Sequence, residues 1–229
     1  MTRKGGLVIH RFSSVTSTQD EARRLLEEGR ARVGHAIVAD EQTGGRGRFG
    51  RAWASPRGGL YATFATSERP LLSLASGMAV VNALDEFNVH ASLKWPNDIV
   101  LGEAKLAGVL IEIHHGTALV GIGVNLEVGP VGMSTSTRTI GAVVRRGDLL
   151  RSIWRELQRD EDPKALLSAY RKRSATLGRR VRILIGEGGQ AVEGIAVAVD
   201  GQGRLVVETC AGRRTITSGE CQHLRVLQT

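Results

Sequence analysis

The sequence predicts an α+β protein in two parts, a larger mixed domain followed by a small β-barrel. Segments of strand-like alternation are interspersed with segments of helical periodicity up to about residue 176, and only short strand patterns follow. The 229 residues, 41% of them hydrophobic and 24% charged, are enough to bury a substantial core. We therefore expect one domain at residues 1–176 and a second at 177–229.

Four helices are predicted in the first domain. They cover 18–29 and 71–87, and two more begin near Asp148 and at Asp162-Pro163. The first opens with Thr18-Gln-Asp-Glu21, which has the spacing of a capping box, and ends at Gly29. The last opens with a capping aspartate and a proline at the first helical position. The other two are indicated by apolar residues at helical spacing.

Strand patterns fill the space between these helices. They lie at 7–12, 36–39, 60–66, 92–95, 106–114 and 117–126. Gly116 separates the last two, which we expect to form a hairpin, and Pro96-Asn-Asp98 reads as a turn. Because strands bury alternate residues, Trp95 and Leu106 are expected in the core.

After Leu177-Gly178 the pattern changes to short strands alone. They lie at 180–185, 191–199, 204–209 and 213–217, with Asp200-Gly201 as a turn. About 50 residues of this kind suit a small β-barrel.

Several classes of protein are excluded by composition. No apolar run is long enough for a transmembrane helix, and the N-terminus has no apolar signal core, so we expect a cytoplasmic protein. Cys210 and Cys221 match no zinc or redox spacing and are expected to be packed thiols. His114-His115 lie on a predicted strand, where neighbours point to opposite faces, so we expect no metal site there.

The net charge of +8 raises the question of nucleic acid. The basic residues are 26 Arg and 5 Lys, and arginine suits planar recognition of phosphate or carboxylate. A nucleic-acid-binding barrel would present exposed aromatic platforms, but the last 50 residues contain no Phe, Trp or Tyr. The composition therefore does not favour a nucleic-acid partner.

The segment Gly44-Gly-Arg-Gly-Arg-Phe-Gly-Arg51 is the most unusual in the chain. Its glycines formally match G-x-G-x-x-G, but a dinucleotide fingerprint must open a helix, and this segment runs into a stretch with proline and more glycines. A phosphate-binding P-loop is excluded because no Gly-Lys-Ser/Thr follows. Four arginines between residues 46 and 57, with no acidic residue among them, suit a polyphosphate or acyl-phosphate. The alternative is a solvated basic turn.

The neighbours of this loop favour the ligand-binding interpretation. Five motifs follow one another in the chain: Ser17-Thr-Gln19, Glu41-Gln42 leading into the loop, Lys94-Trp-Pro-Asn-Asp98, Lys105-Leu-Ala-Gly-Val-Leu-Ile-Glu112 and Gly121-Ile-Gly-Val-Asn125. In this order and spacing they resemble the biotin protein ligase family, whose members carry S-T-N/Q, E-Q-T-x-G-R-G-R-x-G-R, K-W-P-N-D, K-L-A-G-I/V-L and G-x-G-x-N.

The resemblance implies a catalytic domain on a mixed sheet similar to class II aminoacyl-tRNA synthetases, with an SH3-like C-terminal barrel. It implies a ligase that joins biotin to ATP, with Mg²⁺, as biotinoyl-5′-AMP and then biotinylates one lysine of the carrier domain of an acyl-CoA carboxylase. The catalytic residues would be Lys105, Arg48 and Asp98. The biotin site would contain Ser17, Thr18, Gln19, Gln42, Arg46, Gly47, Arg48, Lys105 and Gly108. The adenylate site would contain Arg51, Trp53, Lys94, Asn97, Asp98 and Asn125.

Some of these positions also have a purely structural interpretation. Lys94 could lie on the surface, Asp98 could serve the turn, and Gly121 and Gly123 could allow close packing. Gln19 and Phe49 differ from the commonest family residues and are expected to face outward.

Two questions of partner follow from the resemblance. Many family members carry a DNA-binding motif upstream, and the 16 residues before Ser17 are too few for one, so we expect no repressor activity. A monomer or a homodimer is compatible with the sequence.

A lipoate ligase is the alternative enzyme. It would share the chemistry, but its R-R-x-S-G-G-G-A-V-type loop is absent from this sequence.

Overall fold

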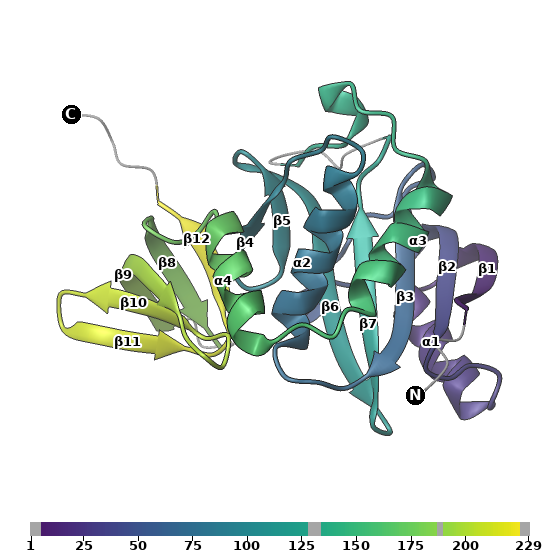
Figure 1. Cartoon of the computed structure of the whole chain (residues 1–229), viewed down its shortest axis with the longest axis horizontal. Helices are drawn as coiled ribbons and strands as arrows, with labels where there is room; N and C mark the ends of the chain where they lie inside the picture. Colours follow the sequence, from purple (N-terminus) through teal and green to yellow (C-terminus); the bar gives the residue numbers. More distant parts are fainter. Residues whose placement is uncertain (1–5, 128–133, 187–189, 225–229) are drawn as a thin grey trace.

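The computed structural model describes residues 6–127, 134–186 and 190–224. Its larger part is built on a seven-stranded mixed sheet in the order β1-β2-β3-β7-β6-β5-β4 (Figure 1). β1 and β2 are parallel, and every other neighbouring pair is antiparallel. The strands are β1 (Val8–Val15), β2 (His35–Gln42), β3 (Leu60–Ser67), β4 (Ser92–Lys94), β5 (Asp98–Leu101), β6 (Ala104–His114) and β7 (Thr117–Val124).

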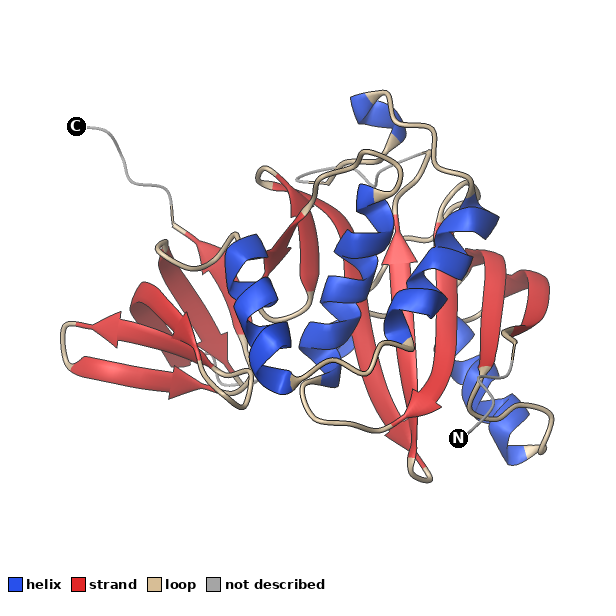
Figure 2. Ribbon diagram, viewed as in Figure 1, coloured by secondary structure: helices blue, strands red, loops and turns tan. Residues whose placement is uncertain are grey.

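Helices cover both faces of this sheet. They are α1 (Thr18–Glu27), α2 (Leu72–Asp85), α3 (Arg146–Leu157) and α4 (Pro163–Arg173), with short 3-10 turns η1 (Arg48–Gly50) and η2 (Arg138–Ile140). The alternation of β7 shows how they are divided. Val120 and Ile122 join the large core under α2 and α3, whereas Leu119 joins a small core with Ala22 and Leu25 of α1. Figure 2 shows α2 and α3 in front of the sheet.

The α1 face of β7 continues from Leu119 with Gly121 and Gly123, on the side away from the large core. Two side chains from other segments, Gln19 and Trp53, lie over these glycines. The absence of side chains here is what leaves room for the site described below.

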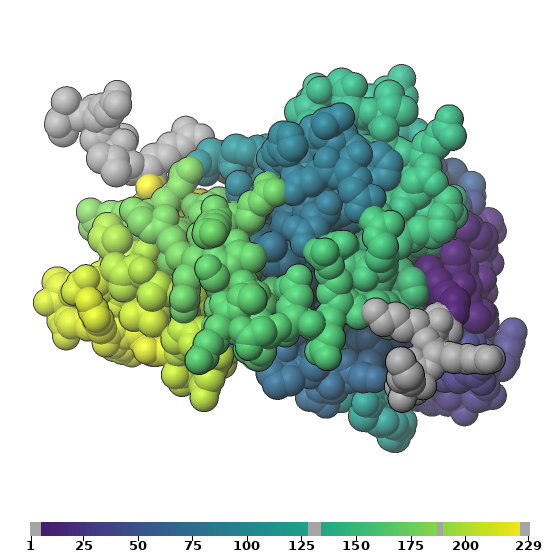
Figure 3. Space-filling model, viewed as in Figure 1, coloured from purple at the N-terminus to yellow at the C-terminus, as the bar shows by residue number. Residues whose placement is uncertain are grey.

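A separate five-stranded antiparallel sheet forms the C-terminal part, in the order β11-β10-β9-β8-β12. Its strands are β8 (Arg180–Ile185), β9 (Gln190–Val199), β10 (Leu205–Thr209), β11 (Gly212–Ile216) and β12 (Glu220–His223). In the space-filling view this sheet packs closely against the rest of the molecule (Figure 3).

Trp95 joins the two parts. Its backbone nitrogen donates to Thr176 Oγ1 at 3.0 Å, and its indole Nε1 donates to the carbonyl of Gly203 in the second sheet at 3.1 Å. Trp95 and Leu106 are buried, as the sequence predicts.

Most expected elements are present, with different ends. The hairpin at Gly116 is confirmed. The expected capping box at Thr18 is wrong by one residue, because Ser17 is the cap and its hydroxyl accepts from the backbone nitrogen of Gln19. β5 begins at Asp98, the last residue of the predicted turn, and neither β5 nor β12 was expected.

Two smaller expectations need correction. Cys221 is buried but Cys210 is exposed, so only Cys221 is a packed thiol. The strand ends at His114, and His115 lies in the turn with a positive φ, so the two rings do not diverge but meet edge to face at 4.3 Å. Throughout the described ranges, no helix combines the length and apolar character needed to cross a membrane.

Candidate active site

A cavity of about 230 Å³ lies on the α1 face of the large sheet. Five parts of the chain line it: the start of α1, the end of β2, the glycine-rich loop up to Trp53, strands β4 to β7 with their turns, and the residues around β12. Nearly all of the expected site residues contribute to this lining, namely Ser17, Thr18, Gln19, Gln42, Arg46, Gly47, Arg48, Arg51, Trp53, Lys94, Asn97, Asp98, Lys105 and Gly108. Segments that are far apart in the sequence therefore converge on one space.

The polar wall beside α1 is a fixed hydrogen-bond network. Gln42 Oε1 accepts from the backbone nitrogen of Thr18 at 2.8 Å and from Thr18 Oγ1 at 3.1 Å. Gln42 Nε2 donates to Ser55 Oγ at 2.8 Å, and Thr63 Oγ1 donates to Thr18 Oγ1 at 2.9 Å. Because each group has a partner, the amide and hydroxyl orientations at this wall are set before a ligand enters.

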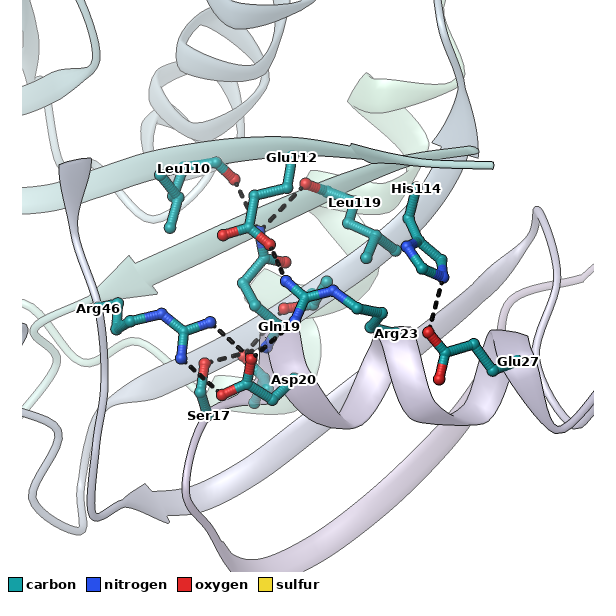
Figure 4. A network of polar contacts seen from close by, with 12 residues as sticks. Ser17, Gln19, Asp20, Arg23, Glu27, Arg46, Leu110, Glu112, His114 and Leu119 are labelled. Atoms are coloured by element: carbon teal, nitrogen blue, oxygen red, sulfur yellow. Dashed lines mark hydrogen bonds and ion pairs between the residues drawn. The ribbon is translucent and has the colours of Figure 1, made fainter. Parts of the chain in front are cut away.

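Gln19 faces inward, contrary to the expectation that it faces outward. Only 3% of the residue is exposed, and its Nε2 lies 3.5 Å and 3.4 Å from the carbonyls of Leu110 and Leu119 (Figure 4). Its Oε1 has no hydrogen-bond partner among the described residues. A Cβ on Gly121 would lie 3.1 Å from the Gln19 amide carbon, so the glycine gives this side chain its place.

The glycine-rich loop forms a narrow hairpin and not the start of a helix. The backbone nitrogen of Trp53 donates to the Gly45 carbonyl at 2.8 Å, and that of Gly47 to the Arg51 carbonyl at 2.7 Å. A Cβ on Gly45 would lie 2.5 Å from the Trp53 carbonyl, so only glycine fits there. Phe49 at the tip is 59% exposed, as expected, and has a φ of 56°.

The indole of Trp53 packs against two glycines of the sheet, Gly108 and Gly123. A Cβ on Gly123 would lie 2.5 Å from Trp53 Nε1, and one on Gly108 would lie 3.3 Å from the indole ring. Lys105 Nζ is 5.1 Å from the ring centroid, within the range of a cation–π contact. The role of Gly123 is therefore not limited to close backbone packing, because its lack of a side chain leaves space for the Trp53 indole.

Three cations of the cavity are paired with carboxylates: Arg46 with Asp20, Arg51 with Glu220, and Lys105 with Asp98. The Lys105–Asp98 distance is 2.7 Å, so Asp98 does more than form a turn. The Arg46–Asp20 contact is bidentate, with both oxygens at 2.6 Å. These pairs reduce the positive charge that each group can offer to an anion.

Arg48 differs from these three cations. Its Nη atoms donate to two neutral acceptors, Asn97 Oδ1 at 3.3 Å and Ser218 Oγ at 2.6 Å. Burial lowers the pKa of its guanidinium, the direction expected for a desolvated cation. Within the described ranges, Arg48 and Lys94 line the cavity with no carboxylate at ion-pair distance. They are the natural binding partners for an anion.

The described residues contain no group of three or more His, Cys, Asp and Glu side chains arranged to hold a metal ion.

Comparison with known proteins agrees with this geometry. Residues 11–128 match the model of the biotin/lipoate A/B protein ligase family, and residues 176–224 match the biotin protein ligase C-terminal domain. The biotin–[acetyl-CoA-carboxylase] ligase of Mycobacterium tuberculosis is 34% identical over 214 residues, which cover 84% of this chain and 80% of that protein. The chain belongs to the biotin protein ligase family.

Solved ligases of this family share the whole architecture. The biotin protein ligase from Aquifex aeolicus in complex with biotin and ATP has a TM-score of 0.81 and 31% identity, covering 96% of this chain and 99% of that chain. The ligase from Leishmania major in complex with biotinyl-5-AMP has a TM-score of 0.69 and 29% identity, covering 92% of this chain and 99% of that chain.

One expected ligase residue lies outside the cavity lining. Asn125 is buried, and its Nδ2 donates to the carbonyls of Thr135 and Lys105 at 3.0 Å and 3.5 Å. It thus supports the backbone that carries Lys105.

The sequence interpretation did not identify Asp20, Ser55 and the β12 residues as parts of the ligase site. Asp20 has a sequence signal, since it stands next to the Ser17-Thr-Gln19 motif, but it reads there as part of a cap. Ser55 and Glu220 become site residues only through long-range packing.

Proposed function

We propose that this chain activates biotin with MgATP as biotinoyl-5′-AMP and transfers the biotinoyl group to one lysine of the biotin carboxyl carrier domain of an acyl-CoA carboxylase. The observation that carries this proposal is the convergence of the motif segments on a single cavity, in a chain of this family. Relatives named as biotin–[acetyl-CoA-carboxylase] ligases support the choice of acceptor.

The end of the cavity near α1 suits the uncharged ring of biotin, which carries two N–H donors and a carbonyl. Short polar groups in a small pocket recognise such a ring. Ser17, Thr18 and Gln42 form an ordered polar wall, and the carbonyl oxygen of Gln19 is an acceptor without a partner among the described residues.

In the first step, a carboxylate oxygen of biotin attacks the α-phosphorus of ATP, and the bond to the pyrophosphate oxygen breaks. Two anions must approach each other, so fixed positive charge stabilises the transition state. Arg48 is suited to this role because no carboxylate lies at ion-pair distance from it among the described residues, and Lys94 lies in the same cavity. Lys105 adds charge beside the Trp53 ring, which offers a stacking surface for adenine.

In the second step, the lysine amine of the carrier domain attacks the acyl carbonyl. The bond from this carbonyl carbon to the phosphate oxygen breaks, AMP leaves, and the nitrogen loses a proton as the amide forms. Walls on several sides of the cavity, including the loop and β12, shield the mixed anhydride from water before this step.

We also propose the finer architecture that the resemblance implies. Residues 1–176 would be the catalytic domain related to class II aminoacyl-tRNA synthetases, and residues 177–229 an SH3-like barrel, as the five antiparallel strands suggest. The chain would act in the cytoplasm on a protein acceptor and not on nucleic acid, as a monomer or homodimer.

The test is mass spectrometry of a carrier domain incubated with the protein, biotin and MgATP. We expect the carrier to gain one biotinoyl group. Arg48→Gln and Lys105→Ala should slow adenylate formation about a hundredfold, the effect of losing about 3 kcal/mol of transition-state stabilisation. Transfer of lipoate or octanoate without transfer of biotin would contradict the proposal.

A further inference from the structure

Four alternating charges run from the glycine-rich loop across the first turns of α1 to β6 (Figure 4). Arg46 binds Asp20 through both of its Nη atoms, each at 2.6 Å. Asp20 also accepts from Arg23 Nη1 at 3.2 Å, and Arg23 Nη2 donates to Glu112 Oε2 at 2.7 Å. We call these four residues the charge chain.

The charge chain begins at the cavity. Arg46 lines it, and Asp20 directly follows Ser17, Thr18 and Gln19, the N-cap and first two residues of α1, which also line it. The base of the loop is held by backbone bonds such as that from Gly44 nitrogen to the Thr16 carbonyl at 2.8 Å. Farther out, the Asp20 side chain of α1 binds Arg46 of the loop.

The geometry also separates the roles of two neighbouring arginines. Arg46 directs both Nη atoms to one carboxylate, whereas Arg48 bonds only to neutral groups. The hydrogen bonds from Arg46 lower the pKa of Asp20, so this carboxylate stays charged under ordinary conditions. Arg46 therefore holds the loop with its charge offset by Asp20, whereas Arg48 has no carboxylate at ion-pair distance among the described residues and is available to a ligand.

We propose that Asp20 is a positioning residue that holds Arg46 and thereby fixes the glycine-rich loop as one wall of the ligand cavity. It acts on how tightly a ligand is retained and leaves the charge that drives the chemistry to Arg48. Its effect on kinetics rests on the proposed biotin ligase function, but its effect on the loop does not.

The first experiment measures the loop without any ligand. Phe49 at the loop tip is exposed, so chymotrypsin can cleave after it, and mass spectrometry can follow that one bond. In Asp20→Asn we expect cleavage there to be about five times faster, because a bidentate charge-assisted pair is lost from a partly exposed site.

Glu21→Gln is the matched control. It removes the next acid of the same first turn, and among the described residues Glu21 forms its ion pair with Arg24 of α1 and none with the loop. Its cleavage rate should equal that of the unaltered protein. Equal rates in Asp20→Asn and in the control would overturn the proposal, whatever reaction the protein catalyses.

The second experiment separates binding from chemistry in biotin-dependent ATP–pyrophosphate exchange. Asp20→Asn should raise the KM for biotin about tenfold and leave kcat within about twofold. Asp20→Glu should recover part of the loss, since it restores the charge. Adding Arg46→Gln to Asp20→Asn should cause little further loss, because the two residues act as a unit.

The outcomes are distinguishable. If the unaltered protein does not exchange pyrophosphate with biotin, the proposed function fails and the proteolysis still decides the role of Asp20. If kcat falls and KM does not change, Asp20 acts on the chemistry and the positioning role is wrong.

Discussion

At the scale of single residues, Gly123 occupies a position where one methyl group would alter the cavity. A Cβ there would lie 2.5 Å from Trp53 Nε1 and 2.6 Å from the adjacent ring carbon. The indole is rigid, so it must move as a whole. In Gly123→Ala we expect a shift in the emission maximum of tryptophan fluorescence. We also expect the KM for ATP, measured in the pyrophosphate-exchange assay, to rise about tenfold.

Gly116→Ala is the control for that substitution. Gly116 has a φ of 74° in the hairpin turn and no neighbouring atom within 4 Å of an added Cβ. Alanine there should cost about 1 kcal/mol of unfolding free energy through backbone strain alone. An unchanged KM for ATP in Gly123→Ala would show that Trp53 does not contribute to the nucleotide site.

At the scale of elements, two N-cap residues make the same kind of hydrogen bond to the first turn of a helix, but only one of them lines the cavity. Ser17 caps α1 by accepting from the nitrogen of Gln19, and Asp162 caps α4 by accepting from the nitrogens of Lys164 and Ala165. Replacing either by alanine should cost about 1 kcal/mol in urea unfolding. Ser17→Ala should also weaken biotin binding, whereas Asp162→Ala should leave the KM for biotin unchanged. Equal KM values for biotin in both variants would show that Ser17 does not contribute to biotin binding.

Elements with strong local patterns could be predicted from the sequence. α2, α3 and α4 follow helical periodicity or a capping signal, and the hairpin of β6 and β7 follows from a glycine between two apolar runs. β5 and β12 have four residues each. Strands this short carry little periodicity, and their pairing partners are defined by the fold of the rest of the chain.

The candidate site likewise contains residues that the sequence identifies and residues that only the folded structure identifies. Its motif residues stand out because glycine, arginine and short polar residues recur in a specific order. The partners that set their charge do not stand out, since Asp20 and Glu220 look like ordinary surface acids in sequence. That Arg48 and Lys94 have no carboxylate at ion-pair distance among the described residues, while Arg46, Arg51 and Lys105 do, follows only from three-dimensional pairing.

At the scale of the whole molecule, His223 of β12 lies where the second sheet meets the rest of the chain. Only 7% of its side chain is exposed, and its Nε2 lies 3.1 Å from Thr176 Oγ1. Glu103, Lys94 and Arg179 surround it. Burial, reinforced by the two cations, lowers its pKa to about 4, from an ordinary value of about 6.5.

The folded protein therefore keeps His223 neutral at a pH where the unfolded chain takes up a proton. Above about pH 6.5 neither state is protonated, and below it the free energy of unfolding falls as pH falls. Between pH 7 and pH 5 this one group should cost about 2 kcal/mol of stability. Urea unfolding at the two pH values should show this loss, and His223→Gln should lack it. The same pH dependence in both proteins would assign the loss to other groups.

The wall that β12 gives to the cavity also has a consequence for the order of synthesis. Ser17, Arg48 and Lys105 leave the ribosome well before Ser218 and Glu220, the residues that hold Arg48 and Arg51 from the second sheet. During translation the large sheet can form with its cavity open on that side. The wall of the cavity around β12 is therefore complete only after the residues of β12 have emerged and paired with β8.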